Sequence, residues 1–215
     1  LALKKLKQQI NAFVLRHGHQ YSGTKWTIKH VTWLKKLELD PVYWKTLDEY
    51  LASCEEQEAK IERYNKRIEE IASEARYQEN AKKLGCFLGI RTHTALSLIV
   101  ENRDFKRFAK GKTYAAFLGL APGERSSSDN VNRPGISKAG NTHLRCLLIE
   151  VAKGICQGAI GHKSKELRSR QSGQPAEVIV YADKANTRLR SKYYKMIRNE
   201  KKKNIAVAGE LVCFV

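Results

Sequence analysis

Residues 44–77, WKTLDEYLASCEEQEAKIERYNKRIEEIASEARY, contain a regular pattern that dominates the first part of the sequence. Small or apolar residues recur every seven positions, and a second series follows three positions later. The two series are Leu47, Cys54, Ile61, Ile68 and Ala75, and then Tyr50, Gln57, Tyr64 and Ile71. This heptad pattern predicts a long helix with one packing seam. The partner is either the helix expected at residues 1–16 or a second protomer, and the sequence does not choose between them.

The remainder of the chain also favours helices, so we expect a mainly α fold. Leu3, Leu6, Ile10 and Phe13 follow the helical period, and residues 26–37 place two tryptophans and His30 on one stripe expected in the core. We predict a helical linker and coiled coil at residues 1–83, with a role in oligomerisation, followed by a compact helical domain at residues 84–215.

The domain predicted at residues 84–215 opens with LGCFLGIRTHTALSLIVE, which indicates a helix, a turn at Gly89 and a second helix. In helix-hairpin-helix elements, such a turn presents backbone N–H groups to a phosphate. We therefore name Gly89, Arg91 and Thr92 as candidate nucleic-acid-binding residues. A plain helical hairpin would have the same pattern.

Charge is distributed unevenly along the 215 residues, which carry a net charge of +18. Residues 101–203 hold 23 basic and 9 acidic residues, a net charge of +14, and residues 1–43 contribute +6. Such an excess favours a polyanionic partner, most simply nucleic acid, bound mainly by the second half of the chain. No run of 18 apolar residues predicts a membrane span, and five scattered cysteines favour the reducing cytosol.

The segment 119–149, GLAPGERSSSDNVNRPGISKAGNTHLRCLLI, carries the strongest functional pattern. Ser126, Ser127 and Ser128 lie in a stretch of turn-forming residues flanked by cations, and Asn141 or Thr142 is placed to cap the following helix. The candidate anion-binding residues around the serines are Arg125, Arg133, Lys138, Asn141, His143 and Arg145. A serine among cations can hold a phosphate, or with a base or metal can act as a nucleophile. The alternative interpretation is that the three serines belong to a flexible loop with no role in binding or catalysis.

These residues resemble the C-terminal domain of the DEDD-type insertion-sequence transposases, the bridge-RNA-guided recombinases. The resemblance rests on Leu118-Gly119-Leu120-Ala121-Pro122, on Ser126-Ser127, on the GISKAGN stretch at 135–141 and on Leu144-Arg145. INAFVLRHGHQYSGTKWTIKHVTWLKKL is similar to the helical linker of these proteins, LGIRTHTA to their helix-hairpin-helix element, and residues 182–215 to their closing helices.

The resemblance implies that a serine attacks a DNA phosphodiester and forms a covalent link, while a structured RNA pairs with the DNA. It places this nucleophile at Ser127, with Ser126 and Ser128 as alternatives. It also implies an N-terminal RuvC-like domain that holds magnesium. No cofactor or metal site is expected within this chain. Because its pattern starts in mid-helix, we expect a fragment, and because the acidic magnesium-binding domain is absent, we expect this fragment to be inactive by itself.

Two other functions stay open on the sequence. The chain could be a non-catalytic helical module that binds nucleic acid, or an RNA-scaffold protein whose coiled coil drives assembly.

Overall fold

A computed structural model describes residues 2–123, 135–198 and 203–215. It confirms a mainly α fold. The strands found among the described residues form one short two-stranded sheet. The chain divides into two compact units, Leu1–Arg67 and Ile68–Val215. Among the described residues, no helix is both long enough and apolar enough to span a membrane.

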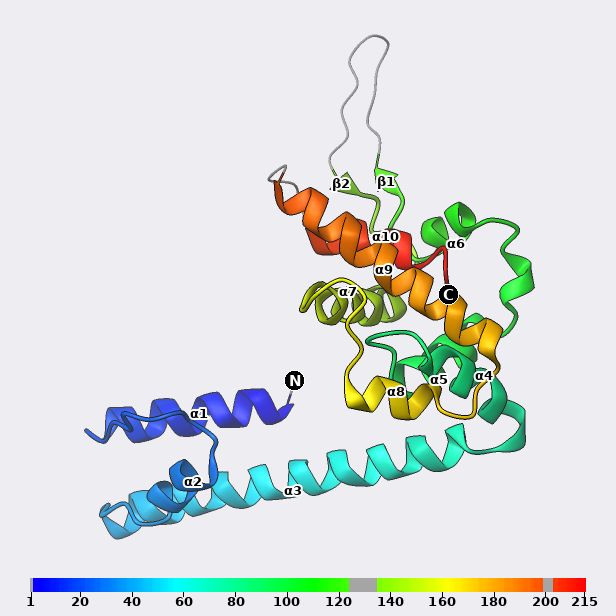
Figure 1. Ribbon diagram of the computed structural model, residues 1–215. Coiled ribbons are helices and arrows are strands. Elements are labelled where there is room, and N and C mark those ends of the chain that lie inside the picture. The colour runs from blue at the N-terminus through cyan, green and yellow to red at the C-terminus, as the bar shows by residue number, and fades with distance from the viewer. Residues whose placement is uncertain (1, 124–134, 199–202) are drawn as a thin grey trace. The chain divides into compact units, whose positions relative to one another are not determined.

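The first unit is built from α1 (Ala2–Arg16), α2 (Ile28–Leu34) and the greater part of α3 (Pro41–Ala72) (Figure 1). Its core joins residues of all three helices, because each helix has its apolar residues on one side. The buried apolar residues are Ile10, Phe13 and Val14 of α1, Leu34 of α2, and Leu47, Leu51 and Cys54 of α3. The first half of the α3 seam therefore packs on α1 within the same chain.

The second half of the predicted seam differs from this first half. Ile61 and Tyr64 are 44% and 59% exposed. The helix also ends at Ala72 rather than continuing to about Tyr77. The Ser73 hydroxyl donates to the Glu69 carbonyl, and Glu74 takes an extended conformation before α4 (Ala75–Gly85) begins. The heptad pattern did not reveal this break, since the apolar spacing continues across it.

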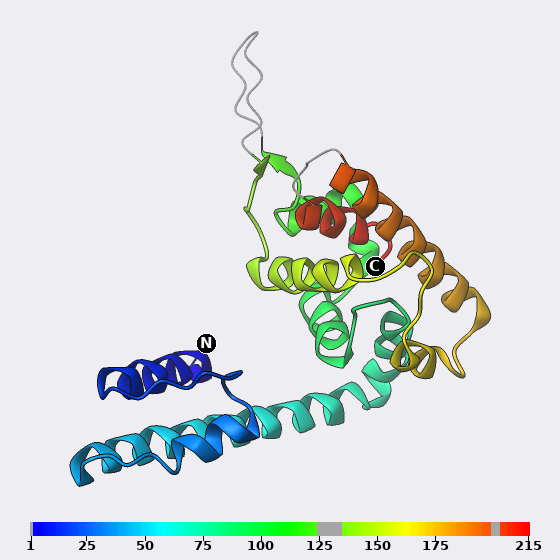
Figure 2. The ribbon, with the colours of Figure 1, turned by 60° about the vertical axis from the view of Figure 1, so that its left-hand side comes forward.

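The second unit is organised around α7 (Thr142–Cys156). Four side chains of α7, Leu144, Leu148, Val151 and Ile155, are buried in its core. The closing helices α9 (Ala176–Arg198) and α10 (Lys203–Leu211) pack against α7 and against each other (Figure 2).

The remaining helices of the second unit include a tight hairpin between α4 and α5 (Thr92–Asn102). Gly89 in this turn has a φ of +83°, and a Cβ atom there would lie 3.1 Å from Val151. A glycine is therefore required both for the turn and for the close approach to α7. The other elements are η1 (Phe105–Arg107), α6 (Gly111–Phe117) and α8 (Lys165–Gln171).

The sheet pairs β1 (Pro122–Gly123) with β2 (Gly135–Ile136) in antiparallel register, Pro122 opposite Ile136 and Gly123 opposite Gly135. Chain connectivity therefore makes residues 124–134 the link between two paired strands. Ser126, Ser127, Ser128, Arg125 and Arg133 belong to this link and lie outside the described residues.

Candidate functional site

The two chain segments that flank the serine link are held together below the strands. The backbone N–H of Ser137 donates to Ala121 (2.9 Å), that of Lys138 to Gly119 (3.0 Å) and that of Asn141 to Phe117 (3.0 Å). Gly140 has a φ of +120°, and a Cβ atom there would lie 2.1 Å from the Phe117 carbonyl oxygen. The glycine in the GISKAGN stretch thus permits the close crossing that fixes both ends of the serine segment.

The first turn of α7 begins directly after this crossing. The Asn141 side-chain oxygen accepts from the Leu144 N–H at 3.0 Å, which confirms the predicted cap. The Asn141 amide nitrogen donates to Glu101 Oε2 at 2.6 Å, and the other Glu101 oxygen contacts His143 Nδ1. Glu101 lies at the end of α5, so these contacts join α5 to the start of α7. They orient the exposed imidazole of His143 next to the crossing below β1 and β2. We call β1 and β2 the hairpin, and this crossing with the first turn of α7 the base of the hairpin.

Arg145 lies one turn from the start of α7, but its side chain is turned inward and is only 8% exposed. Its guanidinium donates to the Leu118 carbonyl at 2.9 Å and to the Thr142 hydroxyl at 3.0 Å. Both acceptors belong to the protein itself. These contacts give Arg145 an internal role, in which it ties α7 to the segment before β1.

Lys138 is exposed and has a φ of +58°, in the left-handed region that non-glycine residues seldom adopt. Its backbone is held there by the bond to Gly119 described above. The structure therefore brings Lys138, Asn141 and His143 to the base of the hairpin, together with Glu101. Sequence reasoning missed Glu101, because it lies 42 positions before His143 and no local motif connects the two.

The other predicted binding residues form a separate group at the α4–α5 turn. Gly89 packs against α7, as described above. Arg91 pairs with Glu166 of α8, with 2.9 Å between Nη2 and Oε2. Thr92 begins α5 and lines a pocket between α4, α5 and α8. No contact described for these residues includes a residue at the base of the hairpin.

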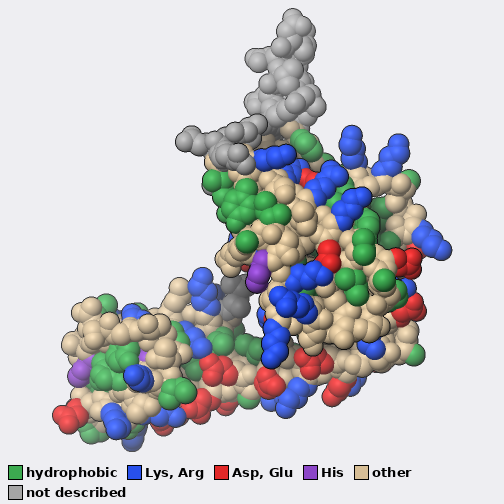
Figure 3. Space-filling model, viewed as in Figure 1, with side chains coloured by type: hydrophobic (Ala, Val, Ile, Leu, Met, Phe, Trp, Pro, Cys, Tyr) green, Lys and Arg blue, Asp and Glu red, His purple; other side chains and the backbone are tan. Residues whose placement is uncertain are grey.

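Positive charge extends well beyond these two groups. On the face shown in Figure 3, Lys and Arg side chains are numerous over the second unit. Some basic residues there are nevertheless internal. Arg190 is 3% exposed and donates to four backbone carbonyls, those of Ile155, Gln157, Ala159 and His162. Burial lowers the pKa of Arg190.

Within the part of the chain that the structure describes, no group of three or more His, Cys, Asp or Glu side chains is arranged to hold a metal ion. The base of the hairpin has one carboxylate and one imidazole, Glu101 and His143, with an amide between them. Its chemistry is therefore that of an oriented histidine next to a cation and a helix N-terminus.

Comparison with known proteins gives a family match over the segment that contains β1, β2 and α7. Residues 81–170, which include the end of α4, then α5, α6, both strands and α7, and most of α8, match the transposase IS116/IS110/IS902 family. A putative transposase y4qE of Sinorhizobium fredii is 30% identical over 218 residues, which cover 99% of this chain and 52% of that protein. The transposase for insertion sequence element IS1533 of Leptospira borgpetersenii is 28% identical over 94% of this chain and 59% of its own length.

A third relative has a shorter match. The transposase for insertion sequence element IS1111A of Coxiella burnetii is 34% identical over 87 residues, which cover 40% of this chain. The chain spans somewhat more than half the length of the first two relatives. From residue 81 to residue 170, therefore, the chain is similar to the IS116/IS110/IS902 transposase family, and the relatives that it matches are named as transposases or putative transposases.

Proposed function

We propose that this chain is the C-terminal part of an insertion-sequence transposase that binds DNA and supplies a serine nucleophile for strand cleavage and exchange. The observation that carries the proposal is the fixed base of the hairpin. Paired strands and the close crossing at Gly140 hold both ends of a segment with three serines and two arginines. Lys138 and the capped start of α7 adjoin this base and favour a bound phosphate.

In the proposed reaction, the Ser127 oxygen attacks a phosphorus atom of DNA and forms a phosphoserine bond. The bond from phosphorus to one strand oxygen breaks, and that oxygen leaves as a hydroxyl after taking a proton. The serine proton is lost to a base. A serine hydroxyl needs activation at neutral pH. Magnesium held by an acidic domain in the full-length protein would supply that activation by stabilising negative charge on the reacting oxygens.

The experiment is covalent trapping on a full-length protein that contains this chain. We expect DNA cleavage with an adduct on Ser127, and no adduct from Ser127→Ala. DNA binding by this variant should stay nearly unchanged, because a neutral hydroxyl contributes only about 1 kcal/mol. An adduct on Ser126 or Ser128 would correct the residue. Recombination by a variant with all three serines replaced by alanine would contradict the serine mechanism.

The proposal includes a guide RNA and self-assembly. A structured RNA is a second polyanion suited to the positive charge of the chain. The exposed Ile61 and Tyr64 favour a helix partner from a second protomer. Tighter binding to structured RNA than to duplex DNA would support the RNA partner, and equal binding would argue against it.

The second candidate is a non-catalytic module that binds nucleic acid in the prokaryotic cytosol. It is favoured by Arg145, because a buried arginine at the start of α7 serves packing rather than a bound phosphate. The two candidates differ in one result. A module would bind DNA, with no covalent adduct even when the rest of the transposase is present.

A further inference from the structure

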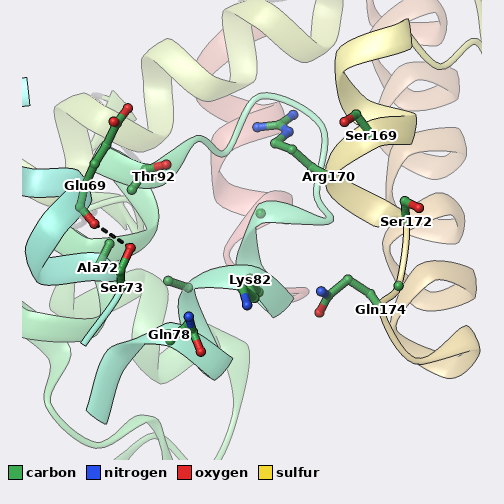
Figure 4. Close-up of a pocket in the computed structure, with 13 residues that line it drawn as sticks. Glu69, Ala72, Ser73, Gln78, Lys82, Thr92, Ser169, Arg170, Ser172 and Gln174 are labelled. Carbon is green, nitrogen blue, oxygen red and sulfur yellow. Dashed lines mark hydrogen bonds between the residues drawn. The ribbon is translucent and has the colours of Figure 1, made fainter. Parts of the chain in front are cut away.

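A pocket of about 650 Å³ lies in the second unit, away from the residues that hold the serine segment. The end of α3, α4, the start of α5 and α8 line it, with the chain that follows α8 (Figure 4). Its volume is in the range of sites that hold a whole small molecule. The lining is unusually polar, since hydroxyl, amide and charged side chains surround it on several sides. These polar residues are Glu69, Ser73, Gln78, Lys82, Thr92, Ser169, Arg170, Ser172 and Gln174.

Arg170 makes one wall of the pocket and is only partly satisfied by the protein. Its Nη1 donates to the Ile90 carbonyl at 2.6 Å, which fixes the guanidinium against the α4–α5 turn. Its Nε is buried, and the described residues offer it no acceptor. Burial lowers the pKa of Arg170. The Nε itself is enclosed by protein atoms, but the guanidinium charge belongs to the pocket lining and would stabilise an anionic ligand there.

The carboxylate of Glu166 lies near enough to act on the charge of Arg170, but the ion pair described for it is with Arg91 of the turn. Arg91 is paired with Glu166 at 2.9 Å. Lys82 on the α4 side of the pocket is exposed, and no described ion pair includes it. The pocket thus has two cations, Arg170 and Lys82, on different walls, with the positive N-terminal turn of α5 at Thr92 as a third source of positive potential.

The remaining polar groups select the kind of anion. An inorganic phosphate would fill a small part of 650 Å³ and would leave the amides of Gln78 and Gln174 unused. Glu69 is the acidic residue of the lining, and a carboxylate repels a second phosphate while it accepts hydrogen bonds from a base amino group. Cations with amides and one carboxylate match the parts of a nucleotide, whose phosphate is anionic and whose base edge is polar.

We infer that this pocket holds one unpaired nucleotide of a nucleic-acid strand, with its phosphate against Lys82 and Arg170 and its base edge against Glu69, Gln78 and Gln174. A base inside a duplex cannot reach such a pocket, whereas a bulged or single-stranded nucleotide can. The inference rests on the proposed binding of nucleic acid, but not on the serine chemistry. Both DNA and RNA offer this ligand chemistry.

The test compares binding of the full chain to a duplex with one unpaired nucleotide and to the same duplex fully paired, in DNA and RNA versions. We expect the bulged probe to bind roughly tenfold more tightly, which corresponds to about one charge-assisted contact. A bulge that carries an abasic site should lose part of this preference. The comparison of DNA with RNA probes shows which nucleic acid supplies the unpaired nucleotide, because the preference for the bulge should be larger for the kind of strand that the pocket accepts.

Lys82→Gln is the informative variant, because Lys82 is exposed and its replacement spares the core. It should remove most of the preference for the bulge. The matched control is Lys112→Gln, since Lys112 is also an exposed lysine, lies on α6 and does not line the pocket. This control removes the same charge and should weaken both probes alike, by roughly twofold. Arg170→Lys keeps the charge without the guanidinium fork and should reduce the preference to an intermediate value.

Three results would overturn the assignment. The first is equal binding of bulged and paired probes, and the second is an equal effect of Lys82→Gln and Lys112→Gln. The third is competition by inorganic phosphate as effective as that by a nucleoside monophosphate. If the chain binds duplex but does not prefer the bulged probe, the role assigned to the pocket is wrong while the proposed function stands. The absence of binding to every nucleic acid would contradict the proposed function as well.

Discussion

The two units bury polar side chains in different ways. Leu1–Arg67 buries His30 among aromatic rings, where its ring lies 4.8 Å from that of Tyr21 and 5.8 Å from that of Trp33. Ile68–Val215 buries arginines, and their environments differ. Arg145 and Arg190 donate to carbonyls of the protein, whereas Arg170 keeps a buried Nε without a described acceptor. The comparison teaches that positive charge alone does not identify a binding surface, because some cations are satisfied within the fold.

The largest effect is expected at Arg190. Arg190→Met should lower the free energy of unfolding of the second unit by about 3 kcal/mol or more, because several buried carbonyls lose their donor. All three tryptophans lie in the first unit, so tryptophan fluorescence reports that unit alone, whereas helical circular dichroism reports the helices of both units. In urea unfolding of the variant, the part of the dichroism change that comes from the second unit should move to lower urea, while the fluorescence transition should stay in place.

The control for this prediction is Arg188→Met, two positions earlier on α9. The Arg188 side chain is 65% exposed and pairs with Glu210, so its replacement should cost less than about 1 kcal/mol. Equal losses from the two variants would mean that the carbonyl contacts of Arg190 do not stabilise the fold. A joint shift of both optical transitions would show that the units do not unfold separately.

A smaller effect is expected at the base of the hairpin. Asn141→Ala should cost about 1–2 kcal/mol, because it removes the α7 cap and the donor to Glu101. Asn141→Ser keeps a capping oxygen and should recover a good part of this loss. Thermal unfolding followed by circular dichroism measures both. If serine and alanine gave the same stability, the cap would not be the source of the effect.

The third prediction concerns the pH dependence of stability, which should differ between the two units. Burial, with a smaller contribution from Lys25, lowers the pKa of His30 below its usual 6.5, and its Nδ1 accepts from the Trp26 N–H at 3.1 Å. The unfolded state therefore binds more protons at mildly acidic pH, and the first unit should lose stability as the pH falls below about 6.5. Tryptophan fluorescence during urea unfolding at several pH values measures this. His30→Gln should flatten the dependence.

In the second unit, the carboxyl group of Glu210 also makes the stability depend on pH, but over a lower pH range than His30. Burial favours a higher pKa for Glu210, but hydrogen bonds from Lys192 and Arg188 outweigh it and hold the pKa below 4.5. The stability that Glu210 contributes is present above pH 4.5 and is lost as the pH falls through its lowered pKa. Mild acid should therefore weaken the first unit before it weakens the second, and the reverse order would contradict the roles assigned to His30 and Glu210.

The smallest effect on stability is expected on the exposed half of the α3 seam. A variant with Ile61→Asp and Tyr64→Asp should change the free energy of unfolding by no more than about 1 kcal/mol, since both side chains are exposed. If the seam joins two protomers, light scattering should show a lower mass for the variant than for the wild type. A wild-type chain that is monomeric at high concentration would contradict the interface between protomers.

Much of the helical fold could be predicted from the sequence, because apolar spacing directly reflects which side of a helix is buried. The spacing of Leu3, Leu6, Ile10 and Phe13 predicted α1, and two of these residues, Ile10 and Phe13, are buried in the core of the first unit. The break at Ser73 could not be predicted in this way. It depends on a side chain that bonds the backbone one turn earlier, while the heptad spacing runs on without interruption.

The candidate site was predictable only in part. Asn141 was recognisable as a cap from its place before an apolar run. Glu101, Arg170 and Lys82 were not, because their importance comes from contacts between helices that are distant in sequence. Arg145 shows the opposite case. Its charge favoured a binding role on the sequence, but its position on α7 turns it toward the Leu118 carbonyl.

The central claim is that the segment joined to the hairpin base binds nucleic acid through its phosphates. The most direct test is the salt dependence of duplex DNA binding for a variant in which Arg125, Arg133 and Lys138 are replaced by alanine. If all three contact phosphates, the slope of log affinity against log salt should become shallower by roughly 2 to 3. The control replaces Lys5, Lys29 and Lys36, three exposed lysines of the first unit, and should change the slope by less than about 1. Equal changes in the two variants, or wild-type binding that does not depend on salt, would contradict the account.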